Sequence, residues 1–149
     1  MSNTENAVGA YDRIFRMLAQ HPAASDPLIC CLYHHDSPPR FAEPMPRDPQ
    51  PEVGQPIDES FAQVVRNAIE ANEAVHDGCV MVAVDETEGR VTGWSYRLFP
   101  PPTEIPPPPN RGSAFNSCLA MSLIPGIFAL YLVSKGSVWR FKLGLADQL

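Results

Sequence analysis

Two clusters of proline divide this chain into segments that can fold. Seven of the seventeen prolines fall within residues 38–57, and another seven fall within residues 100–110. Proline fixes φ and has no backbone N–H, so neither cluster can lie inside a helix. The sequence therefore predicts loops or extended polyproline segments at both places, with regular structure before, between and after them.

The segment before the first cluster, residues 1–37, is expected to contain a helix and then a buried strand. Its apolar residues recur with the spacing of one helix face: Tyr11, Ile14, Phe15 and Leu18. The dipeptide His21-Pro22 ends this pattern. The run PLICCLYHH that follows is apolar up to its histidines, which is typical of a strand buried on both faces.

The segment between the two clusters predicts a helix followed by two strands. Ser60 and Gln63 match a capping box at the start of DESFAQVVRNAIEANEAV. The residues expected to be buried on this helix are Phe61, Val64, Val65, Ala68 and Ile69. CVMVAV and RVTGWSYRL each predict a strand, and DETEG between them predicts a turn because its glycine can adopt a positive φ.

The stretch FNSCLAMSLIPGIFALYLVSKG, residues 115–136, is the most apolar part of the chain. A membrane-spanning helix needs about 20 apolar residues and is disfavoured by the pair Pro125-Gly126 near the midpoint, although a proline-kinked span stays open. We prefer a helix over SAFNSCLAMSLI and a buried strand over IFALYLVS. A turn at SKGS and a further strand at VWRFKL follow.

These elements, in the order α-β-α-β-β-α-β-β, predict a single α/β (α+β) domain over residues 1–149. Helices that alternate with apolar strands imply a mixed β-sheet flanked by helices. Residues 58–145 are expected to form its core, interrupted by the proline-rich loop at 100–110. A chain of 149 residues is a usual size for one domain.

Composition argues against several kinds of partner. The formal net charge is −6, whereas affinity for nucleic acid comes from clustered Lys and Arg, and Arg140 and Lys142 are too few to make such a cluster. The polar N-terminus MSNTENAVGAYDR has no secretory apolar segment, and the four cysteines form no C-x-x-C pair. The sequence therefore predicts a cytoplasmic protein with buried, reduced thiols that binds neither nucleic acid nor a membrane.

Two short motifs carry side chains suited to ligand binding. HDGC, residues 76–79, lies between a helix and a buried strand, where a carboxylate can hold a divalent cation and a glycine lets a ligand approach the backbone. RGS, residues 111–113, opens a helix whose free amides suit a phosphate. Each motif also has a conformational explanation, namely an Asp-Gly turn for the first and an N-cap at Ser113 for the second.

Together these segments resemble one family, the diadenylate cyclase domain of the DNA-integrity-scanning proteins, over residues 61–141. FAQVVRNAIEANEAVHDGCVMV is similar to the family's amphipathic helix and HDGA motif, and GRVTGWSYRLFPPP is similar to the hairpin partner that ends in a Leu-Pro segment. GSAFNSCLAMS is similar to the helix motif GTRHRAALGIS, and IFALYLVSKGSVWRF to the final strands around VSEE-G. The resemblance implies the family's fold and a nucleotide site.

The resemblance also implies roles for particular residues. Asp77 and Gly78 match the family's Asp-Gly, whose aspartate is implied to act on the 3′-hydroxyl and on a metal ion. Gly112 and Ser113 match the Gly-Thr that opens the family's helix, and Ser122 matches its later serine.

Several family residues are absent, and their absence changes the expected function. Ala114, Phe115 and Asn116 replace an Arg-His-Arg triad that holds the triphosphate in the family. Two family glutamates correspond to Leu123 and Lys135. Because phosphoryl transfer depends on positioning and charge stabilisation, the resemblance implies a cyclase-like pocket that has lost catalysis.

The sequence therefore predicts a catalytically inactive, cyclase-like sensor domain that signals to a partner effector protein or through a homo-oligomer. Its expected ligand is a nucleotide, a cyclic dinucleotide or a related small molecule. Phe115 and Asn116 could stack on and hydrogen-bond a base, or Phe115 could fill the core. The residues expected to bind the ligand are His76, Asp77, Gly78, Gly112, Ser113, Phe115, Asn116 and Ser122.

Two other functions stay open. An active nucleotidyltransferase would use Asp77 as its catalytic and metal-binding residue, and only in that case is Mg²⁺ or Mn²⁺ expected as a cofactor. A pure interaction module would use the proline-rich loops as contact surfaces, although PPPPN at 106–110 more often serves as a stiff connector.

Two further polar segments are interpreted as surface features. YHHD, residues 33–36, has residue types found at metal sites, but neighbouring side chains on a strand point to opposite faces, so His34 and His35 cannot readily bind one ion together. We interpret YHHD as a polar strand end. The acidic residues of DETEG, residues 85–89, are interpreted as a solvated loop.

Overall fold

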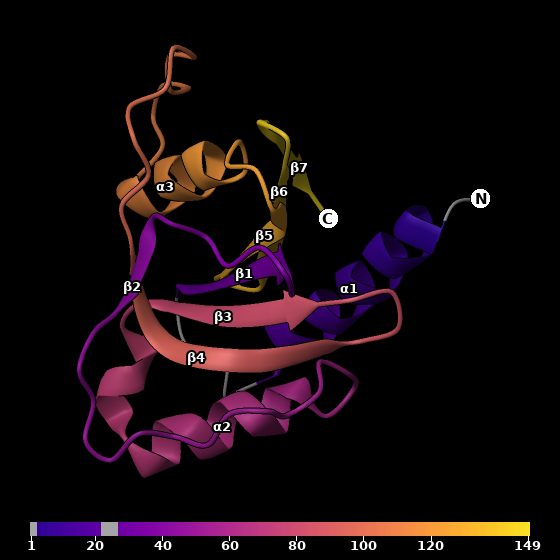
Figure 1. Ribbon diagram of the computed structural model, residues 1–149, viewed down its shortest axis with the longest axis vertical. Helices are drawn as coiled ribbons and strands as arrows, with labels where there is room; N and C mark the ends of the chain where they lie inside the picture. Colours follow the sequence, from indigo (N-terminus) through magenta and orange to yellow (C-terminus); the bar gives the residue numbers. More distant parts are fainter. Residues whose placement is uncertain (1–2, 22–26) are drawn as a thin grey trace.

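The computed structural model describes residues 3–21 and 27–149 (Figure 1). This part of the chain contains three α-helices and a short 3-10 helix: α1 (Asn3–Ala19), α2 (Phe61–Ala71), η1 (Glu73–His76) and α3 (Ser113–Met121). It also contains seven strands: β1 (Leu28–His34), β2 (Ala42–Pro44), β3 (Cys79–Val84), β4 (Gly89–Leu98), β5 (Ile127–Ser134), β6 (Ser137–Lys142) and β7 (Leu145–Gln148).

The seven strands form one mixed sheet in the order β2-β4-β3-β1-β5-β6-β7. β1 runs parallel to β3, and the other neighbouring strands are antiparallel. Helices α2 and α3 lie on opposite sides of this sheet (Figure 1). The predicted fold class, a single α+β domain with a mixed sheet flanked by helices, is confirmed.

β1 lies at the centre of the sheet and sends alternate side chains into two separate cores. Leu28, Cys30 and Leu32 belong to the core beneath α1 and α2. Cys31 and Tyr33 belong to the core beneath α3. All five side chains are buried, so the prediction of a strand covered on both faces is confirmed.

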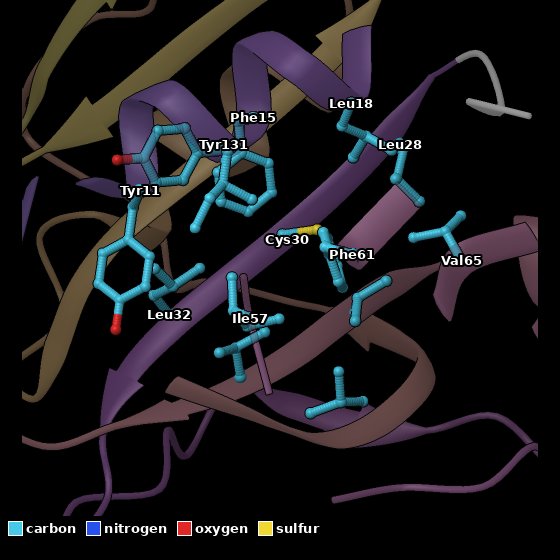
Figure 2. Close-up of a cluster of buried hydrophobic side chains, with 14 of the residues drawn as sticks. Tyr11, Phe15, Leu18, Leu28, Cys30, Leu32, Ile57, Phe61, Val65 and Tyr131 are labelled. Atoms are coloured by element: carbon cyan, nitrogen blue, oxygen red, sulfur yellow. The ribbon is translucent and has the colours of Figure 1, made fainter. Parts of the chain in front are cut away.

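Aromatic rings pack among aliphatic side chains in the core beneath α1 and α2 (Figure 2). Phe15 of α1 stacks on Tyr131 of β5 with ring centroids 4.1 Å apart, and Phe61 of α2 meets Phe15 edge-on at 5.8 Å. Such ring pairs each add about 0.5–1.5 kcal/mol to the effect of area burial. The apolar face predicted for the first helix is buried: Tyr11, Ile14, Phe15 and Leu18.

A buried carboxylate ties α1 to the sheet. Tyr131 donates a 2.7 Å hydrogen bond to Asp12, and Arg140 of β6 forms an ion pair with the second oxygen of the same carboxylate. Burial, followed by the hydrogen bond to Asp12, raises the pKa of Tyr131. Arg140 also reaches Asp147 of β7 at 3.2 Å. This network therefore joins the helix to three consecutive strands.

The apolar stretch 115–136 forms two elements, as predicted. α3 ends at Met121, three residues before the predicted end, and β5 begins at Ile127 after the turn that contains Pro125 and Gly126. Among the described residues, no helix is both long enough and apolar enough to cross a membrane.

Three local predictions need correction. The capping box is wrong: Ser60 makes no capping hydrogen bond, because its hydroxyl and amide both bond to Asp58, while Gln63 bonds to Asn67. On the predicted buried face of α2, Phe61, Val65 and Ala68 are buried, but Val64 and Ile69 are only half-buried.

The proline-rich segment 38–57, predicted as a loop, contains strand β2. β2 pairs antiparallel with β4, and proline is tolerated there because β2 lies at the edge of the sheet. Strand β7, which pairs with β6 at the opposite edge of the sheet, was not predicted from the sequence.

The four cysteines are buried free thiols, which confirms their interpretation as small apolar core residues. Burial raises the pKa of each thiol, that of Cys31 to about 12.

Because the thiolate is the reactive form, the native protein should be nearly inert toward a disulfide reagent such as dithionitrobenzoate at about pH 8. All four thiols should react once denaturant unfolds the chain. Fast reaction of the native protein would contradict the placement of these thiols in the core.

Replacing the buried carboxylate tests the network between α1 and the sheet. Asp12→Ala leaves the Tyr131 hydroxyl without its acceptor and removes the buried partner of Arg140, which keeps its contact with the exposed Asp147. We expect a loss of about 3 kcal/mol in the free energy of unfolding by urea. Glu59→Ala is the matched control, since it breaks the exposed ion pair with Arg13 and should cost less than about 0.5 kcal/mol. If both variants lose the same free energy of unfolding, the buried network stabilises the fold no more than the exposed ion pair does.

Candidate functional site

The two motifs singled out from the sequence meet in one pocket. This cavity of about 570 Å³, which we call the HDG pocket, lies at the amino ends of the parallel strands β1 and β3. Its lining residues come from five elements and their flanks: Pro27, Ile29, Met45, His76, Asp77, Gly78, Cys79, Tyr96, Arg97, Leu98, Ser113, Ala114 and Ser117. Residues 76–78 therefore face the same space as Ser113 and Ala114 in the first turn of α3.

A sharp change of direction brings Asp77 to the pocket. The side chain of Asn72 accepts a hydrogen bond from the amide of Ala74 and so caps η1, which ends at His76. Asp77 follows as the C-cap, and Gly78 then adopts a φ of +99°, a conformation that L side chains rarely take. The turn leads directly into the buried strand β3 and leaves Asp77 exposed at its start.

Gly78 is also required by close packing. A Cβ atom at this position would lie 2.8 Å from backbone atoms of Ser95 in β4, closer than real side chains approach. Ser95 itself has a φ of 58°, at a point where the pairing of β3 with β4 is irregular. The glycine in the HDG motif therefore has a conformational role, whatever the pocket binds.

Ser95 also holds the segment that follows the edge strand β2, beside the pocket. The amide of Met45 donates a 3.0 Å hydrogen bond to the Ser95 carbonyl oxygen, and Arg47 donates one of 3.1 Å to the Ser95 hydroxyl. The Ser95 hydroxyl in turn donates to the carbonyl of Val75 in η1. One buried serine thus holds the edge-strand segment, β4 and η1 together beside the pocket.

The start of α3 forms the other wall. Its N-cap is Gly112 and not Ser113, which is the first helical residue and lines the pocket. Gly112 has a φ of −81°, and an added Cβ would have open space around it. Gly112 itself does not line the pocket.

The three residues that replace the basic triad of the resembled family point to different places. Ala114 lines the HDG pocket. Phe115 is buried in the core beneath α3, where it meets Phe141 and Trp139 edge-on at 4.9 and 5.3 Å. Asn116 lies outside the HDG pocket and lines a neighbouring one. Of the two possibilities for Phe115, the structure therefore has core filling and not base stacking.

Ser122 also lies away from the HDG pocket. Its buried hydroxyl donates a 2.6 Å hydrogen bond to the carbonyl of Leu119 and accepts one of 2.9 Å from the amide of Gly144. These bonds connect the end of α3 to the turn between β6 and β7, so Ser122 has a structural role.

The pocket has little positive charge with which to hold phosphates. Arg97 lines it but donates two hydrogen bonds to Glu43, and its guanidinium lies 5.2 Å from the ring of Phe99. Arg111, from the RGS motif, lies over Phe115 and Trp139 at 4.6 and 4.8 Å and does not line the pocket. Asp77, by contrast, has no ion-pair partner within the described parts of the chain.

The described residues contain no group of three His, Cys, Asp or Glu side chains placed to hold a metal ion. His76, the nearest candidate second ligand to Asp77 in sequence, has its Nδ1 atom 2.6 Å from the carbonyl oxygen of Glu73. A cation at Asp77 would need most of its ligands from a bound phosphate or from water.

The wall that β4 contributes to the HDG pocket was not predicted from the sequence. Tyr96, Arg97 and Leu98 lie at the carboxyl end of this strand, and Ile29 lies near the start of β1. The irregular register between β3 and β4 determines which side chains of SYRL face the pocket, and no pattern in the sequence marks that irregularity.

A second pocket adjoins the first along α3. This cavity of about 430 Å³, which we call the proline pocket, lies between the loop at 100–107 and the exposed face of the helix. Figure 1 shows that loop rising beyond α3. Ser113 and Ser117 line both pockets, so one face of the helix borders each of them.

Known proteins share the fold but not the sequence. No protein-family model and no curated protein matches the chain. A hypothetical membrane spanning protein from Bacillus cereus has a TM-score of 0.65 at 11% identity, covering 96% of this chain. This chain spans only 63% of that protein's chain. A double mutant of DacA from Staphylococcus aureus has a TM-score of 0.54 at 10% identity, covering 97% of this chain and 88% of its own.

The two glycines of the predicted site should respond differently to alanine. Gly78→Ala places a Cβ against the Ser95 backbone at a positive φ, so we expect a loss of about 2 kcal/mol or more in the free energy of unfolding. Gly112→Ala serves as control: its Cβ has open space, so the expected loss is only that of a less favourable N-cap residue, about 0.5–1 kcal/mol. Chemical denaturation measures the free energy of unfolding of both variants. If Gly78→Ala leaves it unchanged, the close approach of the β4 backbone to Gly78 is contradicted.

Proposed function

We propose that this domain is a catalytically inactive, cyclase-like sensor that binds a nucleotide or a related small ligand in the HDG pocket. The observation that carries the proposal is the meeting of Asp77 and the first turn of α3 in a pocket whose lining arginine, Arg97, is paired with Glu43. The same two segments carry the resemblance to diadenylate cyclases. DacA, a diadenylate cyclase, is among the proteins that share this fold.

The chemistry of the pocket favours a ligand with few phosphates. Apolar side chains and the half-buried ring of Tyr96 offer surfaces for a planar base. The Asp77 carboxylate and the hydroxyls of Ser113 and Ser117 suit the hydroxyl groups of a sugar. A triphosphate would meet the Asp77 carboxylate, and Arg97, the arginine that lines the pocket, is already paired with Glu43.

The position of α3 suggests how binding would reach a partner. A ligand that contacts Ser113 and Ser117 touches the helix that also forms one wall of the proline pocket. A shift of α3 would therefore alter the surface beside the loop at 100–107. A partner effector protein, or a second copy of the chain, could recognise that surface.

A thermal-shift panel tests the proposal. A nucleoside, nucleotide or cyclic dinucleotide at a hundred times its dissociation constant adds about 2.7 kcal/mol, which raises the Tm of a domain of this size by roughly 5–10 °C. Asp77→Asn should remove most of that shift, whereas Asp58→Asn, outside the pocket, should not. A panel with no shift at all would contradict ligand binding.

Adding a positive charge to the HDG pocket tests whether its lack of free basic side chains limits the binding of phosphate groups. Ala114→Arg places a guanidinium in the pocket, so affinity for ATP should rise relative to adenosine by about tenfold, equivalent to one charge-assisted hydrogen bond. The matched control, Asn116→Arg, puts the same charge at the proline pocket and should have a smaller effect. Isothermal titration measures both ratios, and equal effects would contradict the proposed arrangement.

The alternatives predict other results. An active nucleotidyltransferase would convert ATP with Mg²⁺ or Mn²⁺ and lose that activity in Asp77→Ala, whereas an inert wild type excludes this function. A pure interaction module, favoured by the proline pocket alone, would bind a partner protein equally well with or without Asp77.

A further inference from the structure

The proline pocket has a volume of about 430 Å³, which lies within the range of known small-molecule sites. Prolines of the loop at 100–107 form one wall, and residues of α3 form the other. The Thr103 hydroxyl donates a 3.1 Å hydrogen bond to the carbonyl oxygen of Ile105, which holds the bend between the two runs of proline. This cavity is therefore shaped independently of the HDG motif.

The pocket is uncharged and largely apolar. None of the described residues that line it carries a charge. Two of its large apolar side chains remain in contact with solvent, since Ile105 is 53% exposed and Leu123 is 37% exposed. Both approach the turn between β6 and β7, where a Cβ on Gly144 would lie 2.9 Å from Leu123 and 3.9 Å from Ile105. A neutral ligand would cover these side chains, whereas an ion would lose its hydration without gaining a partner of opposite charge.

Asn116, which lines this pocket, has a buried acceptor without a partner. Its Oδ1 atom is shielded from solvent but makes no hydrogen bond within the described parts of the chain. There, only Oε1 of Gln55 is in the same state. The Nδ2 atom of Asn116 donates to the carbonyl oxygen of Arg111 over 3.5 Å, close to the limit for such a bond. A flip of the amide would set oxygen against oxygen, so Oδ1 stays the unpaired atom.

The unpaired oxygen and the prolines together indicate what kind of ligand fits. Buried acceptors almost always have a donor, so Oδ1 of Asn116 calls for one from outside the described chain. The long bond at Nδ2 holds the amide weakly, and its broad χ2 torsion lets Oδ1 turn toward a donor in the pocket. Proline-rich segments pack against aromatic rings in known recognition sites. Here the protein supplies the prolines, so the ligand would supply the ring.

We infer that the proline pocket binds a small, neutral aromatic molecule that carries an N–H donor, as an indole does. Its ring packs against the prolines of the loop and the side chains of Ile105 and Leu123, and its N–H donates to Oδ1 of Asn116. A purely apolar ring leaves Oδ1 unpaired, and a phosphate finds no basic side chain among the described residues of the lining. This inference does not depend on what the HDG pocket binds.

Titration of the full chain with a matched pair of probes tests this inference. Benzofuran has nearly the same shape as indole, with a ring oxygen in place of the N–H group. We expect indole to shift the backbone amide NMR signals of Ile105, Asn116 and Leu123 in a saturable way, but not those of Gly78 and Cys79, which line only the HDG pocket. Benzofuran should bind about fivefold more weakly. Absence of saturable shifts with indole, or equal affinity for the two probes, would overturn the inference.

Variants separate the roles of the acceptor and of the apolar wall. Asn116→Leu removes the acceptor, so it should bind indole about fivefold more weakly and benzofuran unchanged, which abolishes the preference between them. Ile105→Ser, on the exposed loop, should weaken both probes by about threefold. Its matched control Val53→Ser changes an exposed apolar side chain outside the pocket and should weaken neither.

Asp77→Asn should also bind indole like the wild type, so loss of ligand binding in the HDG pocket and loss of binding in the proline pocket are told apart. If Asn116→Leu keeps the preference for indole, or if Val53→Ser weakens binding as much as Ile105→Ser, the inference fails.

Discussion

The parallel pairing of β1 with β3 is the constraint on which the rest of this structure depends. Two parallel neighbours need a crossover connection, and here the chain between them supplies β2, α2 and η1 before it returns to the sheet. Both strands then end at the same edge of the sheet. This is why the motif at 76–79 meets the start of β1 in the HDG pocket, and why the turns after β1 and β3 meet at the opposite end of the two strands.

The first turn of α3 determines what the HDG pocket can bind. Consecutive residues on a helix are about 100° apart, so only one of Ala114, Phe115 and Asn116 faces the pocket. That residue is alanine, and the guanidiniums of Arg97 and Arg111 are held by Glu43 and by aromatic rings respectively. The pocket keeps the shape that joins two segments of chain but has little positive charge, which is the basis for proposing binding without catalysis.

Most of the fold could be predicted from the sequence, because it depends on periodicity that local residues carry. The apolar face of α1, the continuous apolar run of β1 and the division of 115–136 at Pro125 and Gly126 all have direct sequence signatures. The edge strands do not, since β2 lies among prolines and β7 is a short, mostly exposed strand. Edge strands are held by backbone pairing with a neighbour, which leaves little trace in the side-chain pattern.

The candidate site was predictable in part, for the same reason. HDG and the RGS turn were found as motifs, but the direction of each side chain depends on tertiary packing. Phe115 faces the core, Ser122 bonds to Gly144, and the wall formed by Tyr96 follows from an irregular strand register. None of these placements is encoded by spacing along the chain.

One measurement addresses the central claim directly: a backbone amide NMR titration of the whole domain with nucleosides, nucleoside monophosphates and cyclic dinucleotides. Ligand binding in the HDG pocket predicts that at least one of them shifts the signals of Gly78, Ser113 and Ser117 in a saturable way. The claim is contradicted if none of these compounds shifts those three signals.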